Sequence, residues 1–110
     1  MKYKVMIVED QTMPRELFEL RIQSSEHFET ALSIDNASLA EVYCLRFPVD
    51  LILMDVVTRN GENGLDAAAK IKRAFPQIKI IIVTSMPEYS YLSRAREIGV
   101  ESFWYKEEQR

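Results

Sequence analysis

Short apolar runs alternate along the chain with segments in which apolar residues recur every three or four positions. The runs predict strands over residues 3–8, 28–34, 50–55, 78–83 and 102–105. The second of them is less apolar than the rest, which places it at or near a sheet edge. Because strands alternate with helical patterns and no hairpin signal occurs, we predict a parallel sheet covered by helices in a three-layer α/β fold.

The first two expected helices are marked by a proline and by a capping pattern. Pro14 suits the first turn of a helix, where its missing N–H costs nothing. Residues 38–41, Ser-Leu-Ala-Glu, form a capping box that would begin the second helix, and Pro48 closes it. The apolar residues at helical spacing are Met13, Leu17 and Leu20 in the first helix and Leu39, Val42 and Tyr43 in the second.

The third and fourth helices carry clearer stop signals. Pro76 ends the third helix, and Pro87-Glu88 begins the fourth. Gly99 is a suitable residue just past the end of the fourth helix. Their apolar positions are Leu65, Ala68, Ile71 and Phe75 in the third helix and Tyr91, Ala95 and Ile98 in the fourth.

Composition limits the class of protein without naming it. The 110 residues suffice for one domain, and 47% apolar with 28% charged residues is typical of a folded globular chain. The net charge of -3 gives no sign of a nucleic-acid surface within this segment. A single cysteine, Cys44, excludes an internal disulfide and favours a reducing compartment. No apolar run is long enough to span a membrane, so we expect a cytoplasmic protein.

Polar side chains follow four of the predicted strands where each strand ends. Glu9-Asp10 follows the first strand, Asp55 the third, Thr84 the fourth and Lys106 the fifth. The carboxyl ends of parallel strands meet at one edge of the sheet, where ligands bind in open α/β folds. Three carboxylates there would suit a divalent cation, and an ammonium with a hydroxyl would suit a phosphoryl group.

In this order and at these strand ends, the residues resemble the receiver domains of bacterial two-component response regulators. The resemblance covers the whole chain and implies a doubly wound, flavodoxin-like α/β fold with a five-stranded parallel sheet in strand order 2-1-3-4-5. A fifth helix would be missing. We therefore expect residues 1–110 to be one receiver domain that stops before or within its last helix, with a longer protein supplying the missing cover.

The resemblance also implies a role for each residue. Asp55 would accept the phosphoryl group, and Lys106 would neutralise its charge. Thr84 and Phe103 would be the hydroxyl and the aromatic ring that switch on activation, although Phe103 could instead serve core packing alone. The Mg²⁺ ligands would be Glu9, Asp10, Asp55 and the backbone carbonyl of Val57.

The same resemblance implies the partners. A sensor histidine kinase or a small phosphodonor would supply the phosphoryl group, and the domain would not be an enzyme in the ordinary sense. Lys106 is followed by Glu107, where many relatives have proline, as in receivers attached to LuxR-type (NarL-type) DNA-binding domains. DNA would then be bound only through a domain absent from this chain, with no membrane partner. A homodimer stays open.

Two departures from the family pattern bear on function. The segment after Asp55 lacks the usual proline and is one residue longer, and Gly61 and Asn63-Gly64 would let it turn, so we expect it to be more mobile than usual. Val57 and Met86 are apolar where many relatives place polar side chains that orient water. We therefore predict a long-lived phosphorylated form.

Two other functions remain open at this point. The unusual loop after Asp55 is compatible with a phosphorylation-independent interaction module on the same fold. A small hydrolase or phosphotransferase would need a second acid beside its nucleophile, and the sequence Asp55-Val56-Val57 lacks one. A nucleotide- or flavin-binding protein is disfavoured because no glycine-rich loop follows the first strand.

Overall fold

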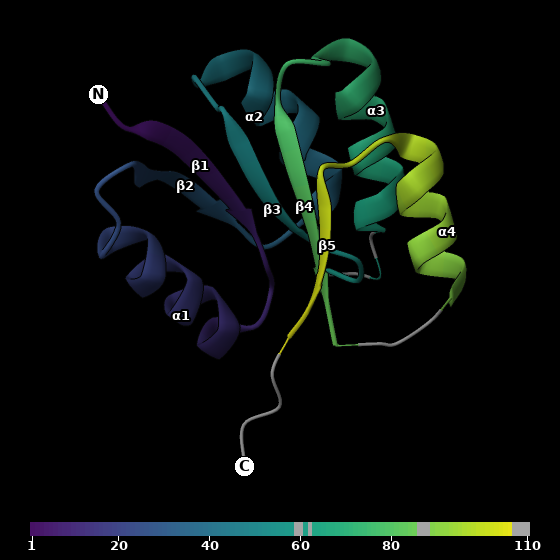
Figure 1. Cartoon of the computed structure of the whole chain (residues 1–110), viewed down its shortest axis with the longest axis horizontal. Helices are drawn as coiled ribbons and strands as arrows, with labels where there is room; N and C mark the ends of the chain where they lie inside the picture. The colour runs from purple at the N-terminus through teal and green to yellow at the C-terminus, as the bar shows by residue number, and fades with distance from the viewer. Residues whose placement is uncertain (59–60, 62, 86–88, 107–110) are drawn as a thin grey trace.

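The computed structural model describes residues 1–58, 61, 63–85 and 89–106, and it confirms the predicted parallel sheet. The strands lie in the order β2-β1-β3-β4-β5, and every adjacent pair runs parallel (Figure 1). The elements are β1 (Tyr3–Val8), α1 (Thr12–Gln23), β2 (Phe28–Ile34), η1 (Ala37–Leu39, a 3₁₀ turn), α2 (Ala40–Arg46), β3 (Leu51–Asp55), α3 (Gly64–Ala74), β4 (Lys79–Thr84), α4 (Tyr89–Ile98) and β5 (Ser102–Tyr105).

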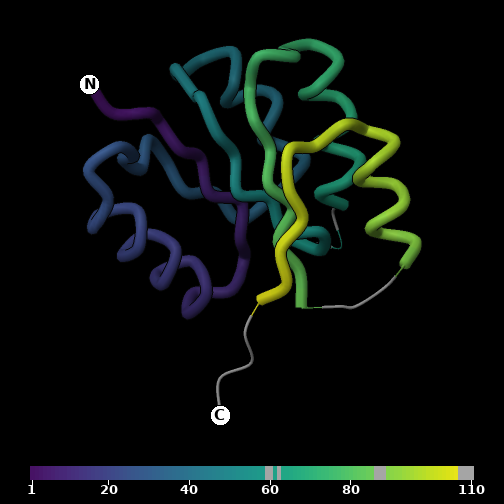
Figure 2. The backbone as a smooth tube through the Cα atoms, viewed as in Figure 1, coloured from purple at the N-terminus to yellow at the C-terminus, as the bar shows by residue number. Residues whose placement is uncertain are grey.

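The helices cover the two faces of the sheet unequally. Helix α1 packs on one face, whereas α2, α3 and α4 lie side by side on the other, as the backbone trace in Figure 2 shows. The larger core lies between the sheet and α2–α4 and contains Met6, Ile52, Ile80 and Ile82. The smaller core lies under α1 and contains Val5, Ile7, Leu53 and Val83.

The central strands form because their side chains are apolar on both faces. Ile7, Ile52 and Ile80 have no exposed surface, and burying each such side chain stabilises the fold by about 1.5–3 kcal/mol. Strand β2 lies at the edge and is only half-buried, as its weaker apolar character predicted. The opposite edge strand, β5, puts Phe103 against the larger core and leaves Trp104 half-exposed.

The predicted capping box at residues 38–41 is wrong. The chain first forms the 3₁₀ turn η1, and Asn36 caps it by accepting hydrogen bonds from the Ser38 backbone N–H (2.9 Å) and hydroxyl (2.7 Å). Leu39 precedes α2 in a helical conformation and makes no side-chain cap. The hydroxyl of Ser38 is therefore a donor to Asn36 and not the cap of α2.

The predicted apolar side of the second helix is also wrong for two of its three residues. Leu39 and Val42 are 44% and 46% exposed, whereas Ala40 and Cys44 face the core. Burial raises the pKa of the Cys44 thiol to about 11, as is typical of a structural thiol. Helix α1 was predicted from Met13, Leu17 and Leu20, and these lie on its outer side while Phe18 and Ile22 pack against the sheet.

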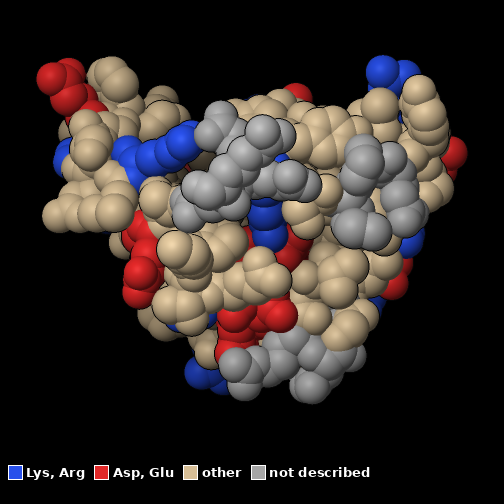
Figure 3. Space-filling view, turned by 90° about the horizontal axis from the view of Figure 1, so that it is seen from below, with Lys and Arg blue, Asp and Glu red and all other residues tan. Residues whose placement is uncertain are grey.

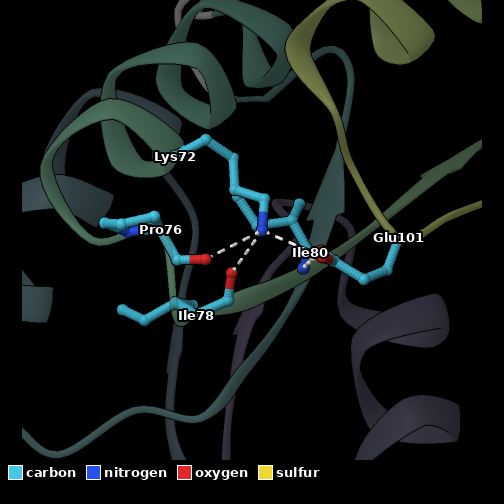
Figure 4. A network of polar contacts seen from close by, with 5 residues as sticks. All are labelled: Lys72, Pro76, Ile78, Ile80 and Glu101. Atoms are coloured by element: carbon cyan, nitrogen blue, oxygen red, sulfur yellow. Dashed lines mark hydrogen bonds and ion pairs between the residues drawn. The ribbon is translucent and has the colours of Figure 1, made fainter.

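Near the amino-terminal end of β4, the ion pair of Lys72 and Glu101 joins α3 to the turn before β5 (Figure 4). Lys72 Nζ donates to the carbonyls of Pro76 (3.4 Å) and Ile78 (2.9 Å) and to the Glu101 carboxylate (3.0 Å). The other Glu101 oxygen accepts from the Ile80 N–H at 2.8 Å. Burial alone would raise the pKa of Glu101, but the Ile80 and Lys72 contacts outweigh it and hold that pKa below its ordinary value.

The last described helix ends where the sequence predicted. Gly99 has φ +88°, a left-handed conformation that suits glycine, and its N–H donates to Ala95 at 3.1 Å. The predicted start at Pro87-Glu88 lies outside the described residues. None of the helices in the described part of the chain combines the length and apolarity needed to cross a bilayer.

Candidate functional site

The five polar side chains singled out in the sequence lie at the carboxyl ends of their strands. Glu9 and Asp10 follow β1, Asp55 and Thr84 are the last residues of β3 and β4, and Lys106 follows β5. Figure 3 looks onto this end of the molecule, where acidic side chains gather beside a basic one near the middle of the face. The carboxyl end of β5 is held beside the end of β4 because the Lys106 N–H donates to the Thr84 carbonyl at 2.8 Å.

The three carboxylates form one compact cluster. One oxygen each of Glu9, Asp10 and Asp55 lies within 4.8 Å of the others. Glu9 and Asp55 are only 1% and 7% exposed, because β1 and β3 are neighbouring inner strands. Lys106 reaches into the cluster, with Nζ 2.6 Å from Glu9 Oε1 and 3.3 Å from Asp55 Oδ2. The cluster thus combines three carboxyl groups with one ammonium group.

This arrangement disfavours ionisation of Asp55. Burial, followed by the charge of Glu9, raises the pKa of Asp55 to about 7, and Lys106 only partly offsets this. Burial alone would lower the pKa of Lys106, but its contact with Glu9 and the charge of Asp55 raise that pKa above its ordinary value. The site therefore has an excess of negative charge that an added cation would neutralise.

The residues present fit a divalent ion such as Mg²⁺. Carboxylate oxygens are the ligands that this small, hard cation prefers. Glu9 Oε1 is buried and makes no hydrogen bond of ordinary geometry within the described part of the chain, although the Lys106 ammonium lies close to it. Glu9 Oε2 accepts a hydrogen bond from the Gln11 N–H at 3.1 Å, which orients the carboxylate. Glu9, Asp10 and Asp55 are thus available as metal ligands.

The remaining predicted site residues have different surroundings. Thr84 is 2% exposed at the end of β4, and Val57 is 51% exposed two residues beyond Asp55. Phe103 packs against the larger core and meets Tyr105 edge-on, with ring centroids 5.4 Å apart. The switching roles of Thr84 and Phe103 and the metal contact of Val57 stay predictions. Met86 and Glu107, which also entered the sequence predictions, lie outside the described residues.

The loop after Asp55 contains two anchors that the sequence analysis missed. Thr58 is 2% exposed, and its hydroxyl accepts a hydrogen bond from the Ala37 N–H at 2.9 Å. Gly64 begins α3 so close to β3 that a Cβ atom there would lie 1.8 Å from the Asp55 backbone oxygen. Gly61, with φ +70°, does supply the predicted turn, but Gly64 is required for close approach instead. The predicted mobility of this loop stays a prediction.

The fold and the edge cluster define a flavodoxin-like α/β domain with a candidate divalent-cation site. A family model described as response regulator receiver domain matches residues 5–110, and the chain belongs to this family. It is a receiver domain of the kind found in two-component response regulators. The family and fold expected from the sequence are thereby confirmed.

Individual relatives support this assignment. The chain is 27% identical over 103 residues to the oxygen regulatory protein NreC of Staphylococcus haemolyticus, a match that covers 94% of this chain and 48% of that protein. A crystal structure of a LuxR-family DNA-binding response regulator from Staphylococcus aureus superposes with a TM-score of 0.87 at 27% identity, over 97% of this chain and 88% of that one.

A LuxR-family two-component response regulator from Aurantimonas sp. SI85-9A1 gives a TM-score of 0.88 at 20% identity, over 99% of this chain and 77% of that one, and shows the fold alone. The chain spans about half the length of the curated relatives that it matches.

Proposed function

We propose that this receiver domain accepts a phosphoryl group on Asp55 and thereby switches a surface that controls the rest of its protein. The observation that carries the proposal is the buried carboxylate of Asp55 between Glu9 and Lys106. A carboxylate is an established nucleophile for forming an aspartyl phosphate. The Asp55 oxygen would attack phosphorus, the new P–O bond would form, and the bond to the donor would break with its electron pair leaving on the donor.

The other site residues would do what phosphoryl transfer requires, which is positioning and neutralisation of charge. Lys106 already contacts Asp55 and would stay beside the added phosphoryl oxygens. Glu9, Asp10 and Asp55, with the Val57 carbonyl, would hold Mg²⁺. When bound, that ion neutralises the carboxylates and the phosphoryl oxygens together. Thr84 would hydrogen-bond the phosphoryl group, and Phe103 would change its packing in response.

The family and the relatives support the proposed partners. Receiver domains are signalling modules, and we propose that this one takes its phosphoryl group from a sensor histidine kinase rather than acting as a classical enzyme. One solved relative is described as a DNA-binding response regulator of the LuxR family, and NreC as an oxygen regulatory protein. We propose that the protein of which this chain is a part controls transcription through a DNA-binding domain outside residues 1–110.

Intact-mass spectrometry after incubation with acetyl phosphate tests the proposal. The wild type with Mg²⁺ should gain one phosphoryl group, and acetate should leave as the anion. The gain should disappear without Mg²⁺ and in the Asp55→Asn variant. A folded wild-type chain that binds Mg²⁺ but gains no phosphoryl group would contradict the proposal and favour a phosphorylation-independent interaction module.

A further inference from the structure

Thr58 ties the loop after Asp55 to the turn after β2. Its hydroxyl accepts a hydrogen bond from the backbone N–H of Ala37, the first residue of η1, at 2.9 Å. Both residues are almost fully buried, at 2% and 1% exposed. The Thr58 carbonyl in turn accepts from the Gly61 N–H at 3.1 Å. Thr58 is therefore held through both its side chain and its backbone.

The residue before Val57 is held as well. The Val56 carbonyl accepts a hydrogen bond from the Gly64 N–H at 2.6 Å, at the start of α3. Val57 itself pairs with Asn63 in an isolated antiparallel bridge. The Asn63 side chain caps α3 by accepting from the Leu65 N–H at 2.7 Å. The backbone on both sides of the Val57 carbonyl is thus attached to neighbouring elements.

The geometry of the peptide unit connects Thr58 to the Val57 carbonyl. That carbonyl and the Thr58 N–H belong to one planar peptide group, so the orientation of Thr58 limits the direction of the carbonyl. Ala37, the donor of this hydrogen bond, also lies only a few residues along the chain from a contact with the site. Ile34, three residues before Ala37, accepts from the Glu9 N–H at 2.9 Å. One hydroxyl therefore connects the Val57 side of the site to the Glu9 side.

We propose that Thr58 is a positioning residue for the divalent-ion site. Thr58 holds the Val57 carbonyl in one orientation relative to the acidic cluster. The inference rests on the proposed metal-dependent function. It goes beyond that function because it assigns a role to a side chain that does not itself belong to the cluster. Metal ligands depend on such outer hydrogen bonds, whose loss lowers metal affinity by about 10–100-fold.

Two variants remove this hydrogen bond from opposite ends. Thr58→Val keeps the shape of the side chain but removes the acceptor. Ala37→Pro removes the donor at the first position of a helical turn, where proline is tolerated. Asn36, which would precede that proline, is extended (φ -139°, ψ 113°), as a residue before proline should be. Thr58→Ser keeps the hydroxyl and is the rescue variant.

Ser33→Ala is the matched control, because the Ser33 hydroxyl donates to Glu19 at 3.1 Å and joins β2 to α1 instead of to the loop. The measurements are Mg²⁺ affinity by calorimetry, amide hydrogen exchange and urea unfolding, each on the whole chain. We expect Mg²⁺ to bind about tenfold more weakly to Thr58→Val and Ala37→Pro. Thr58→Ser and Ser33→Ala should keep the wild-type affinity, although Ser33→Ala also loses stability.

The outcomes separate this inference from the proposed function. Wild-type Mg²⁺ affinity in both Thr58→Val and Ala37→Pro would overturn the positioning role, even if the loop amides exchange faster. Equal weakening in Ser33→Ala would overturn it too, because the effect would then follow from general destabilisation. A wild-type chain that binds no Mg²⁺ and gains no phosphoryl group would instead refute the proposed function, and the metal-positioning role with it.

Discussion

Replacing Asp55 by asparagine should stabilise the metal-free domain near neutral pH. The pKa of Asp55 is raised from 3.8 to about 7 by burial and by the charge of Glu9, so the folded protein binds more protons than the unfolded chain across that interval. Stability should therefore fall as the pH rises through this window. Three pH units correspond to a ceiling of about 4 kcal/mol. The attraction between Asp55 and Lys106 is one of the causes that set this pKa, so the ceiling already includes it, and we expect a net gain of no more than about 4 kcal/mol.

Urea unfolding followed by circular dichroism, in EDTA at about pH 5 and about pH 8, measures this difference. The wild type should lose stability between the two pH values, and Asp55→Asn should lose much less. Mg²⁺ at about 100 times its Kd should return about 2.7 kcal/mol to the wild type and far less to the variant. Glu26→Gln, which changes an exposed carboxylate elsewhere, should behave as wild type. A variant no more stable than the wild type at about pH 8 would refute the reasoning.

Four further changes test other parts of the account. Gly64→Ala should destabilise the domain by about 3 kcal/mol, measured by urea unfolding, because its Cβ would lie 1.8 Å from the Asp55 backbone oxygen; a neutral effect would contradict the close approach. Val57→Asn should shorten the lifetime of the phosphorylated form by about an order of magnitude in a mass-spectrometric time course, because an amide can orient water where Val57 cannot; an unchanged lifetime would contradict this. Lys72→Met should cost about 1 kcal/mol, measured by urea unfolding, because the part-buried Ile78 carbonyl loses its hydrogen bond to Lys72. The pKa of Glu101 is lowered from 4.5, so its contribution to the free energy of unfolding is present above that pH and is lost as the pH falls below it. Glu101→Gln should therefore flatten the acid side of the curve of stability against pH. An unchanged curve would show that the ion pair of Lys72 and Glu101 contributes nothing.

The strands other than β2 could be predicted because each is a largely apolar run bounded by polar residues, whereas β2 is interrupted by Glu29, Thr30 and Ser33. The side on which a helix packs was harder to predict. Leu39 and Val42 have helical spacing, but the chain enters α2 through the 3₁₀ turn η1. A 3₁₀ turn has three residues per turn instead of about 3.6, so other side chains face the sheet. Ala40 and Cys44 are buried instead, and small residues of this kind give a weak signal in a hydrophobic pattern.

The location of the acidic cluster could be predicted because parallel strands bring their carboxyl ends to one edge. The anchors of the loop could not. Thr58 lies 21 residues from Ala37, and a threonine after a strand carries no sign of such a distant partner. The need for glycine at position 64 depends on where the Asp55 carbonyl lies, which only the packing of α3 on β3 determines. The raised pKa of Asp55 likewise depends on burial, which the sequence alone does not measure.

Mapping the acceptor of the phosphoryl group tests the central claim most directly. The chain would be incubated with acetyl phosphate and Mg²⁺, reduced with borohydride and digested, and its peptides sequenced by mass spectrometry. Borohydride converts an aspartyl phosphate to homoserine, so the account predicts homoserine at position 55 and at no other aspartate. Homoserine at Asp10 or elsewhere, or aspartate retained at position 55 in a chain that carries a phosphoryl group, would contradict it.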